Sequence, residues 1–454
     1  MAEPVSRRRS FALLIYVWLT HGLSFLAPLL IGMRQRQGKE LPGRERERLG
    51  HATKPRPVGK LIWFHCASLG ESSVVKIVID ALRARGLNLP ILVTTTTKSS
   101  ALFWQKLDLA GVTHQFAPVD FPEPCRRFLR HWRPDIGLFV ESELWPNLLR
   151  EAHRNGVKLA LINARMNAKS LRFWSFWARD FQSLLSNFSW IGVADKATFQ
   201  GLSLILTPSS GKNAVATPPI SPVGNLKAAL TRTTFSWAEQ ETFRHLSSLV
   251  GSRFIWLGAS THVGEDEILL RAHSLLRQDY PDALLILVPR KPERGKELAA
   301  LATSDGFVVT RWSEMRMVDS TQAVLIGDSL GEMDLWLGLC HAVFVGGSLL
   351  AQFRGHNPME AIAHGRCVLV GPHFDSFADL YALLFDHDLA QIAGDAQRIA
   401  SILREQMSAL KERQAYGRTD ATEVEKVLQQ GQNAINITVE HINALIHEVP
   451  DARP

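Results

Sequence analysis

Cysteine is scarce in this chain, and the spacing of the cysteines argues against a fold held together by disulfides or by structural zinc. The 454 residues include four cysteines, Cys66, Cys125, Cys340 and Cys367. No CxxC pair and no Cys/His spacing typical of zinc ligands occurs among them, so neither a disulfide framework nor a structural zinc site is expected. The pattern predicts a catalytic body that stays reduced in the cytosol.

Short-period repeats and low-complexity blocks are also missing. Hydrophobic residues make up 46% of the chain and charged residues 21%, which excludes an intrinsically disordered protein. Residues 386–388 have the form of a DxD metal motif but follow no predicted strand. His262 and His356 have no partner at metal-ligand spacing. No metal and no other cofactor is therefore expected.

What the chain does contain is an excess of basic residues, with a formal net charge of +7 and a pI near 9.3. This balance fits nucleic acid, an anionic membrane surface or an anionic substrate equally well. Residues 11–33 carry no formal charge and are long enough to cross a bilayer, and basic residues follow between Arg34 and Arg48. We expect a membrane anchor, spanning the bilayer or lying in its interface, with the later residues on the cytoplasmic side.

Apolar runs of strand length alternate with helical patterns in two series. The first series comprises residues 61–65, 91–94, 136–140, 159–162 and 190–193. The second comprises residues 254–257, 284–288, 307–309, 324–326, 342–345 and 368–370. Continuous apolar runs are typical of parallel strands buried on both faces. The sequence predicts two doubly wound α/β domains facing across a cleft.

The length also favours two domains over one. A loose stretch rich in Ser, Pro and Thr, residues 207–222, separates the two series. We expect an anchor and basic linker at residues 1–50, a first domain at 51–222 and a second domain at 223–454. The last helices are expected to be able to return to the first domain.

Residues 344–360 combine a glycine turn with the start of a helix. Residues 346–348 (Gly-Gly-Ser) follow an apolar run, at a place where backbone N–H groups can approach an anion. Asn357, Pro358 and Glu360 have the order of a helix N-cap, a first helical residue and a capping-box acid. Two interpretations stay open. The segment is a capping box alone, or it is a nucleotide site with phosphate at the turn and ribose on Glu360.

Polar residues recur where predicted strands end, which is the edge where open α/β sheets bind ligands. They include Glu71, Glu141 and Glu143 in the first half, Lys227 near the linker, and Arg290 in the second half. Each has a structural alternative: a capping box at Glu71, surface carboxylates, a solvated lysine, an exposed charge cluster. Because so many coincide, we predict a ligand site.

An aromatic stretch at residues 171–190 repeats at helical intervals. Such a stripe is ordinarily buried in a core. The alternative is a surface that contacts lipid.

Taken together, the motifs resemble the bacterial Kdo transferase family, whose members move 3-deoxy-D-manno-oct-2-ulosonic acid (Kdo) from CMP-Kdo to a lipid A precursor. The resemblance covers nearly the whole chain, including the N-terminal hydrophobic stretch. The motifs, in family order, are WFHCASLGE (63–71), FAPVDFP (116–122), RPDIGLFVESELWPNLL (133–149), INARMNAKS (162–170), GNLK (224–227), GASTHVGEDE (258–267), VPRKPER (288–294), DSLGEM (328–333), FVGGSL (344–349) and GHNPMEAIAHG (355–365).

This resemblance implies an inverting glycosyltransferase of the GT-B type that needs no metal. The first domain would bind the acceptor and the second domain CMP. Glu71 matches the general base, and Glu141 and Lys227 match the transition-state stabilisers. The residues that match the CMP contacts are Pro289, Arg290, Leu330, Gly331, Glu332, Asn357, Pro358, Met359 and Glu360.

The resemblance also implies the partners and the location. The substrates would be CMP-Kdo and the lipid A precursor lipid IVA, at the cytoplasmic face of the bacterial inner membrane, with membrane lipids and no nucleic acid as partners. One alternative is a GT-B transferase that uses a different nucleotide sugar. Another is an inactive, membrane-anchored glycolipid-binding protein, which the joint presence of Glu71, Glu141 and Lys227 disfavours.

The chain departs from the usual family pattern at three places. Arg354 stands where glycine usually precedes Gly-His-Asn, Lys291 replaces a histidine after Pro-Arg, and Ala228-Ala229 replace an aromatic–acid pair after Lys227. None of these changes removes a residue matched to catalysis. They bear on the expected shape of the CMP pocket and on the number of Kdo units added.

Overall fold

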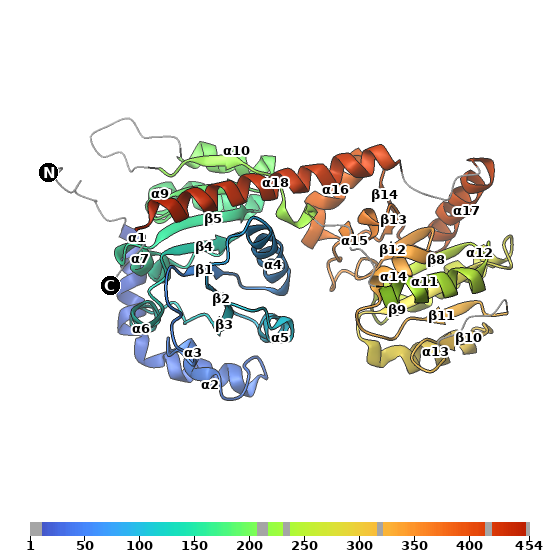
Figure 1. Ribbon diagram of the computed structural model, residues 1–454, viewed down its shortest axis with the longest axis horizontal. Helices are drawn as coiled ribbons and strands as arrows, with labels where there is room; N and C mark the ends of the chain where they lie inside the picture. Colours follow the sequence, from blue (N-terminus) through green and yellow to red (C-terminus); the bar gives the residue numbers. More distant parts are fainter. Residues whose placement is uncertain (1–10, 207–216, 230–236, 316–320, 414–419, 451–454) are drawn as a thin grey trace. The chain divides into compact units, whose positions relative to one another are not determined.

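The structure, a computed structural model, describes residues 11–206, 217–229, 237–315, 321–413 and 420–450. The chain divides into two α/β units, each built on one parallel sheet (Figure 1). The first unit comprises residues 1–229 and 431–454, and the second comprises residues 230–430. The division thus follows Ala229, and the end of the chain returns to the first unit. Most of the loose stretch at 207–222 lies outside the described residues.

The sheet of the first unit has seven parallel strands in the order β3-β2-β1-β4-β5-β6-β7. All five predicted runs are confirmed as strands. The prediction missed β3 and β7, which carry polar residues and form the two edges. The strands are β1 (Ile62–His65), β2 (Ile91–Thr95), β3 (Val112–Phe116), β4 (Ile136–Val140), β5 (Lys158–Ala164), β6 (Trp190–Val193) and β7 (Ile220–Pro222).

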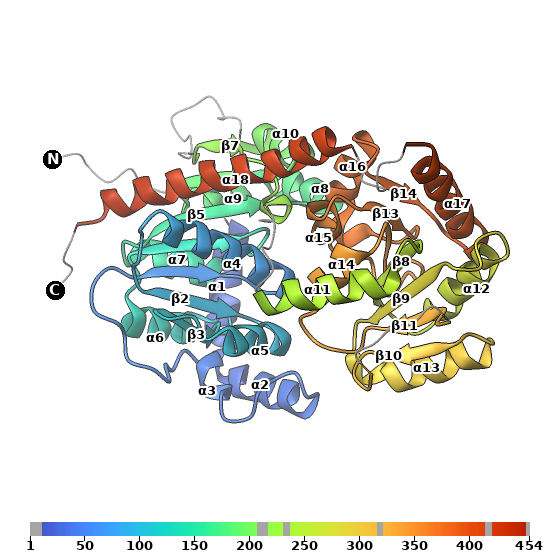
Figure 2. The same cartoon turned by 45° about the vertical axis from the view of Figure 1, so that its right-hand side comes forward.

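Helices cover both faces of this sheet (Figure 2). One core lies against α4, α5 and α18, and the other lies against α6, α7, α9 and α10. Ile62 and Phe64 point into the first core and Leu61 and Trp63 into the second, because side chains alternate along a strand. The helices are α3 (Glu45–Arg48), α4 (Leu69–Ala84), α5 (Lys98–Leu107), α6 (Pro122–Trp132), α7 (Pro146–Arg154), α8 (Ala168–Phe176), α9 (Ala178–Leu185), α10 (Lys196–Leu206), the 3₁₀ turn η2 (Leu226–Ala228) and α18 (Ala421–Glu448).

The second unit repeats this plan, with the strand order β10-β11-β9-β8-β12-β13-β14. Five of its strands match the predicted runs. The predicted run at residues 307–309 is wrong by about two residues, and β14 was missed. The strands are β8 (Ile255–Thr261), β9 (Leu284–Pro289), β10 (Val309–Arg311), β11 (Val324–Ile326), β12 (Ala342–Val345), β13 (Cys367–Val370) and β14 (Ala390–Ile392).

A buried core fills the space between this second sheet and α12, α13 and α17. The helices of the unit are α11 (Trp237–Val250), α12 (Asp266–Arg277), η3 (Pro292–Arg294), α13 (Gly295–Ser304), α14 (Met333–Leu339), α15 (Met359–Ala363), η4 (Asp375–Phe377), α16 (Ala378–Asp386) and α17 (Ala396–Arg413).

The expected membrane anchor is not one continuous helix. It consists of α1 (Phe11–Gly22), η1 (Ser24–Leu26) and α2 (Ala27–Arg36), with Pro28 in the first turn of α2. Among the described residues, no single helix is both long and apolar enough to cross a membrane. The helical segments 12–22 and 24–36 are long and apolar enough only when they are taken together, and a bend of 54° separates them.

Polar contacts attach α1 to the first unit beside α6 and α7 (Figure 1). The Tyr16 hydroxyl donates to Asp120 Oδ2 at 2.9 Å, and Asn147 Nδ2 donates to Thr20 Oγ1 at 3.0 Å. The backbone N–H of Leu13 donates to Asp180 Oδ1 at 3.1 Å. These contacts fix one side of α1 to the unit, while Trp18 on the helix stays 74% exposed.

The aromatic stretch at residues 171–190 is split between the two predicted roles. Phe181 is buried, and its ring stacks on Trp174 with centroids 4.5 Å apart. Phe173 and Phe176, on the preceding helix α8, are 57% and 82% exposed. The core interpretation therefore holds for the second half of the stretch, and the first half presents aromatic side chains to the surroundings.

Candidate active site

Glu71 is placed at the carboxyl edge of the first sheet by the start of α4. Ser68 is the N-cap, and its Oγ accepts the backbone N–H of Glu71 at 3.3 Å. The Glu71 carboxylate accepts the Ser68 hydroxyl at 2.8 Å and the Ala67 N–H at 2.6 Å. The predicted capping box is confirmed, with the acid reaching one residue beyond the cap. It holds both oxygens of Glu71 in place.

The environment of Glu71 favours its uncharged form. The residue is 8% exposed. Burial and then the neighbouring Glu143 carboxylate raise its pKa to about 7, although the hydrogen bonds from Ala67 and Ser68 oppose this. A carboxylate with a pKa near neutrality is suited to accept a proton from a hydroxyl group during a reaction.

Glu141 and Lys227 form an ion pair. Lys227 Nζ lies 2.6 Å from Glu141 Oε1, and the two side chains are only 11% and 17% exposed. Glu141 directly follows β4 and has a φ of 57°, a left-handed conformation that is uncommon for residues other than glycine. Such backbone strain concentrates at functional sites. The structure thus brings together two residues that are 86 positions apart in the sequence.

Asn163 orients this ion pair from β5. It too is left-handed, with a φ of 51°. Its Oδ1 accepts the Leu226 N–H at 2.9 Å, and Asn225 Oδ1 accepts the N–H of Lys227 at 2.9 Å. Asn163 therefore fixes the turn that carries Lys227 to the sheet, and Asn225 stabilises the turn from within. Asn163 lies after a predicted strand and within a family motif, yet it was not among the predicted site residues.

Glu143 adds a third carboxylate to the same edge. Its Oε2 accepts the indole N–H of Trp145 at 2.8 Å and lies 4.0 Å from Nε2 of the buried His65. Burial raises the pKa of Glu143 and lowers the pKa of His65 to about 3, so His65 is neutral. His65 is the last residue of β1 and Glu143 follows β4, and the strand order reverses between these two neighbouring strands. Open α/β sheets bind ligands at such a reversal.

In the second unit, the glycine turn after β12 is already occupied by a carboxylate of the protein itself. The N–H groups of Gly347, Ser348 and Leu349 donate to Glu265 at 2.7, 2.9 and 2.9 Å. Glu265 thus accepts the N–H groups that the nucleotide interpretation assigned to a phosphate, and these contacts do not favour that part of the interpretation. Glu265 is fully buried and fills the anion position.

The residues matched to CMP lie on three loops of the second unit. Pro289 is the last residue of β9, and the backbone N–H of the exposed Arg290 donates to Thr261 O at 3.0 Å. Gly331 has a φ of 84° in the loop before α14, beside Leu330, which is 73% exposed. Glu332 immediately precedes α14.

The third loop, residues 357–360, differs from the predicted capping box. Helix α15 begins at Met359, so Pro358 precedes the helix and is not its first residue. Asn357 Oδ1 accepts the N–H of Met359 at 3.0 Å and still acts as a cap. Within the described residues, the Glu360 carboxylate makes no hydrogen bond that would complete a capping box.

Glu360 lies close to a charge from helix α14 and a charge from the loop after β9. Loss of solvent and the nearby Asp334 carboxylate raise the pKa of Glu360, and the Arg290 guanidinium opposes them. His364 Nε2 lies 2.9 Å from Asp334 Oδ1. Arg290 and Glu360, which are 70 positions apart, are thus brought into one charged cluster.

Arg354, one of the departures from the family pattern, has a left-handed backbone conformation. Its φ is 60°, and the next residue, Gly355, has a φ of 84°. A left-handed position favours glycine, which is the usual family residue at 354. The chain keeps this backbone conformation although arginine replaces glycine.

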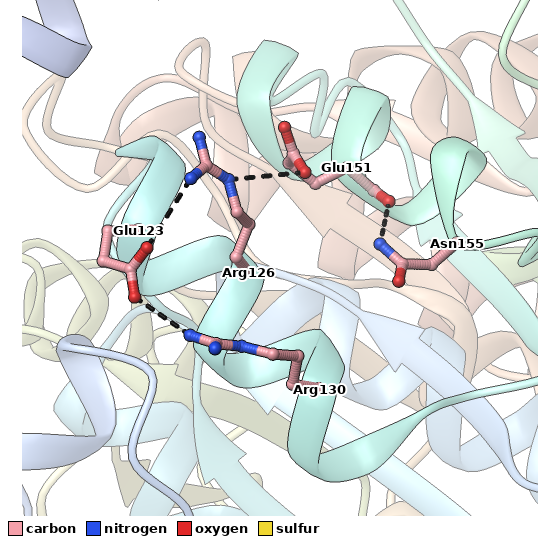
Figure 3. Close-up of a pocket in the computed structure, with 5 residues that line it drawn as sticks. All are labelled: Glu123, Arg126, Arg130, Glu151 and Asn155. Carbon is pink, nitrogen blue, oxygen red and sulfur yellow. Dashed lines mark hydrogen bonds and ion pairs between the residues drawn. The ribbon is translucent and has the colours of Figure 1, made fainter.

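A separate hollow lies on the helices of the first unit. It is lined by Glu123, Arg126, Arg130, Glu151 and Asn155 (Figure 3). Arg130 pairs with Glu123 at 3.0 Å, and Arg126 lies 3.7 Å from Glu151. The charges of this hollow are matched among its own residues, and it lies on α6 and α7 and not at the strand ends. It is therefore separate from the strand-end residues around Glu71.

Comparison with known proteins decides the family. A family described as "3-Deoxy-D-manno-octulosonic-acid transferase (kdotransferase)" matches residues 43–227. The "Probable 3-deoxy-D-manno-octulosonic acid transferase, mitochondrial" of Arabidopsis thaliana is 36% identical over 375 residues, which cover 82% of each chain. The chain belongs to the 3-deoxy-D-manno-octulosonic acid transferase family. It is therefore a glycosyltransferase, as the motifs predicted.

Other relatives agree with this membership. The 3-deoxy-D-manno-octulosonic acid transferase of Haemophilus influenzae is 32% identical and covers 74% of this chain and 76% of its own. A glycosyltransferase from Rickettsia africae has a similar structure, with a TM-score of 0.55 over 86% of this chain and 99% of its own. At 9% identity that similarity shows the fold alone. The predicted GT-B fold of two parallel-sheet α/β units is confirmed.

Proposed function

We propose that this transferase moves Kdo from CMP-Kdo to a lipid A precursor, lipid IVA, in lipopolysaccharide biosynthesis. The single observation that carries the proposal is the buried Glu71, held at both oxygens, with a pKa of about 7, at the strand-order reversal of the first sheet. The names of the relatives support Kdo as the transferred sugar.

In the proposed reaction, Glu71 acts as the general base. A sugar hydroxyl of the acceptor attacks the anomeric carbon of Kdo, and its proton passes to the Glu71 carboxylate. The bond from that carbon to the phosphate oxygen breaks, and its electron pair leaves with CMP. Attack on the face opposite the leaving group inverts the configuration in one step, so no covalent intermediate with the enzyme forms.

Lys227 and Glu141 respond to the charges that develop in this step. The anomeric carbon becomes oxocarbenium-like, and a carboxylate near the ring stabilises it. The ammonium group of Lys227 offsets negative charge on the Kdo carboxylate or the phosphate. Because the pair is preorganised by Asn163 and Asn225, little reorganisation is needed at the moment of reaction.

The second unit is proposed to bind the donor through Pro289, Arg290 and the loops at residues 330–332 and 357–360. Arg290 is exposed and lies near the end of β9, where its guanidinium can reach an anionic ligand. No metal and no other cofactor has a role in this proposal, because Arg290 and Lys227 supply the positive charge.

We also propose that the enzyme works at the cytoplasmic face of the bacterial inner membrane. The support is the exposed apolar surface of α1, η1 and α8, which includes Trp18, Phe25 and Phe176 at 74%, 73% and 82% exposure. Apolar side chains at such exposure are typical of surfaces that enter the interfacial region of a membrane. The net positive charge of the chain favours an anionic leaflet.

Titration calorimetry with CMP tests the donor assignment. Arg290→Ala is expected to weaken CMP binding by roughly 10- to 100-fold, because a charge-assisted hydrogen bond is lost. Arg271→Ala is the matched control, since Arg271 is an exposed arginine on α12 of the same unit. Equal affinities for the two variants would contradict the donor site.

A further inference from the structure

Two histidines with no assigned role meet in the second unit. His262 Nε2 lies 2.8 Å from His356 Nε2, and the ring centroids are 5.1 Å apart. His262 directly follows β8, and His356 lies on the segment after β12. These two strands are neighbours, and the strand order of the second sheet reverses between them. The pair therefore stands at the edge position where such sheets bind ligands.

The fold holds both rings in place. His262 stacks on Phe353 with centroids 3.9 Å apart. His356 packs against Gly347, where an added Cβ would lie 2.8 Å from its Nε2. The Tyr381 hydroxyl donates to the His356 carbonyl oxygen at 3.2 Å. A side chain at position 347 would displace the ring, so the glycine after β12 makes room for the histidine pair.

The contact between the two Nε2 atoms fixes where the protons lie. One ring must donate its Nε2–H to Nε2 of the other ring. In the neutral pair, the donor ring therefore has no proton on Nδ1, and the acceptor ring carries its proton on Nδ1. One more proton can add at the bare Nδ1 without breaking the contact between the rings. The pair can thus change its charge from zero to +1 and keep its geometry.

The surroundings keep the pair neutral while no anion is bound. Burial and then Arg290 lower the pKa of His356 to about 4. Burial lowers the pKa of His262, and nearby cations lower it further, whereas the Glu265 carboxylate raises it. The groups that face the pair are Glu265, Arg290, Lys291 and Arg294 for His262, and Arg290 and His262 for His356. An anion bound beside Arg290 would oppose the effect of these cations.

We propose that His262 and His356 bind the anionic phosphate of the donor as a pair and take up one proton when it binds. This inference rests on the proposed function, because it takes a nucleoside monophosphate ester as the ligand. Nδ1–H groups on the pair then donate to phosphate oxygens while Arg290 supplies the fixed positive charge.

The same proton serves the transfer step. As the bond from the anomeric carbon to the phosphate oxygen breaks, the electron pair remains on that oxygen. The protonated pair donates a hydrogen bond, and then its proton, to this oxygen. The proton of the acceptor hydroxyl goes to Glu71, so one proton is gained at Glu71 and one is lost from the histidine pair.

Titration calorimetry tests the inference, with the methyl phosphodiester of CMP as the probe. Its phosphate keeps a single charge around neutral pH, so any proton exchanged comes from the protein. Repeating the titration at neutral pH in buffers of different ionisation enthalpy gives the number of protons taken up. The wild type is expected to take up a substantial fraction of one proton per ligand.

His262→Asn and His356→Asn are expected to abolish this uptake and to weaken binding by roughly 10-fold. The control is His245→Asn, at an exposed histidine of α11 in the same unit, and it is expected to behave as the wild type. Binding by the wild type without proton uptake, or uptake that persists in both variants, would overturn the inference alone. If the wild type does not bind the probe, the donor assignment fails, and the inference fails with it.

Discussion

At the scale of the residue, Glu71 has two roles that act against each other. As a helix cap it accepts hydrogen bonds from Ser68 and Ala67, which favour the ionised carboxylate. Burial and the adjacent Glu143 favour the protonated acid, and they outweigh the hydrogen bonds. The result is a carboxyl group that is fixed in position and has a pKa of about 7, high enough to receive a proton during the reaction.

This balance predicts the pH dependence of transfer. The proposed base, Glu71, must be ionised before the acceptor reacts, so kcat/KM for the acceptor, measured at saturating donor, is expected to fall as the pH falls through about 7. Glu143→Gln removes the neighbouring like charge, while the amide oxygen can still accept the Trp145 N–H. The acidic limb of the profile should then move to lower pH. A profile that the substitution leaves unmoved would contradict the proposed influence of Glu143 on Glu71.

At the scale of the element, the turn that carries Lys227 depends on a glycine from the far end of the chain. A Cβ on Gly431 of α18 would overlap the backbone of Ala228, the last residue of η2. Any residue other than glycine at position 431 would therefore hold α18 farther from the turn. This contact, together with Asn163, fixes the position of Lys227 relative to the sheet.

Gly431→Ala is accordingly expected to push η2 away from α18. We expect the free energy of unfolding to fall by about 1–3 kcal/mol, because overpacking forces the backbone to move. The transfer rate should fall by roughly 10-fold or more, because Lys227 is displaced. Gly394→Ala is the control, since an added Cβ there meets only the ring of Pro372 at 3.8 Å. Equal stability and rate in the two variants would contradict this account of Gly431.

The inner strands of both sheets could be predicted from the sequence more reliably than the edge strands. All the inner strands of both sheets coincide with continuous apolar runs, because both of their faces are buried. The strands that were missed or shifted, β3, β7, β10 and β14, are the edge strands. An edge strand is less buried and tolerates polar residues such as Thr113 and His114 in β3, so its apolar pattern is weaker.

The candidate site was predictable to a similar extent. Residues at strand ends and in family motifs could be named, and the structure places Glu71, Glu141 and Lys227 in one unit. The occupant of the glycine turn could not be named, because Glu265 is 82 positions away from Gly347. The histidine pair spans 94 positions in the same way. Both contacts depend on which loops the sheet order brings together.

At the scale of the whole molecule, the N-terminal segment is the surface that we propose to hold the enzyme at the membrane. Its polar side is attached to the first unit through Tyr16 and Thr20, and its apolar side is exposed. The replacement of Trp18 and Phe25 together by serine is expected to reduce sedimentation with anionic lipid vesicles several-fold. Val58→Ser is the control, since Val58 is an apolar residue that is 94% exposed before β1. Unchanged sedimentation of the double variant would contradict the proposed membrane surface.

The measurement that tests the central claim most directly is Kdo transfer by the purified protein. CMP-Kdo is generated in situ, a tetraacylated lipid A precursor is the acceptor, and the lipid is analysed by mass spectrometry. We expect the wild type to increase the lipid mass by whole Kdo units, and Glu71→Gln to give no product while it still binds CMP. A wild type that binds CMP but leaves the lipid unchanged, or a Glu71→Gln variant with wild-type turnover, would contradict the account.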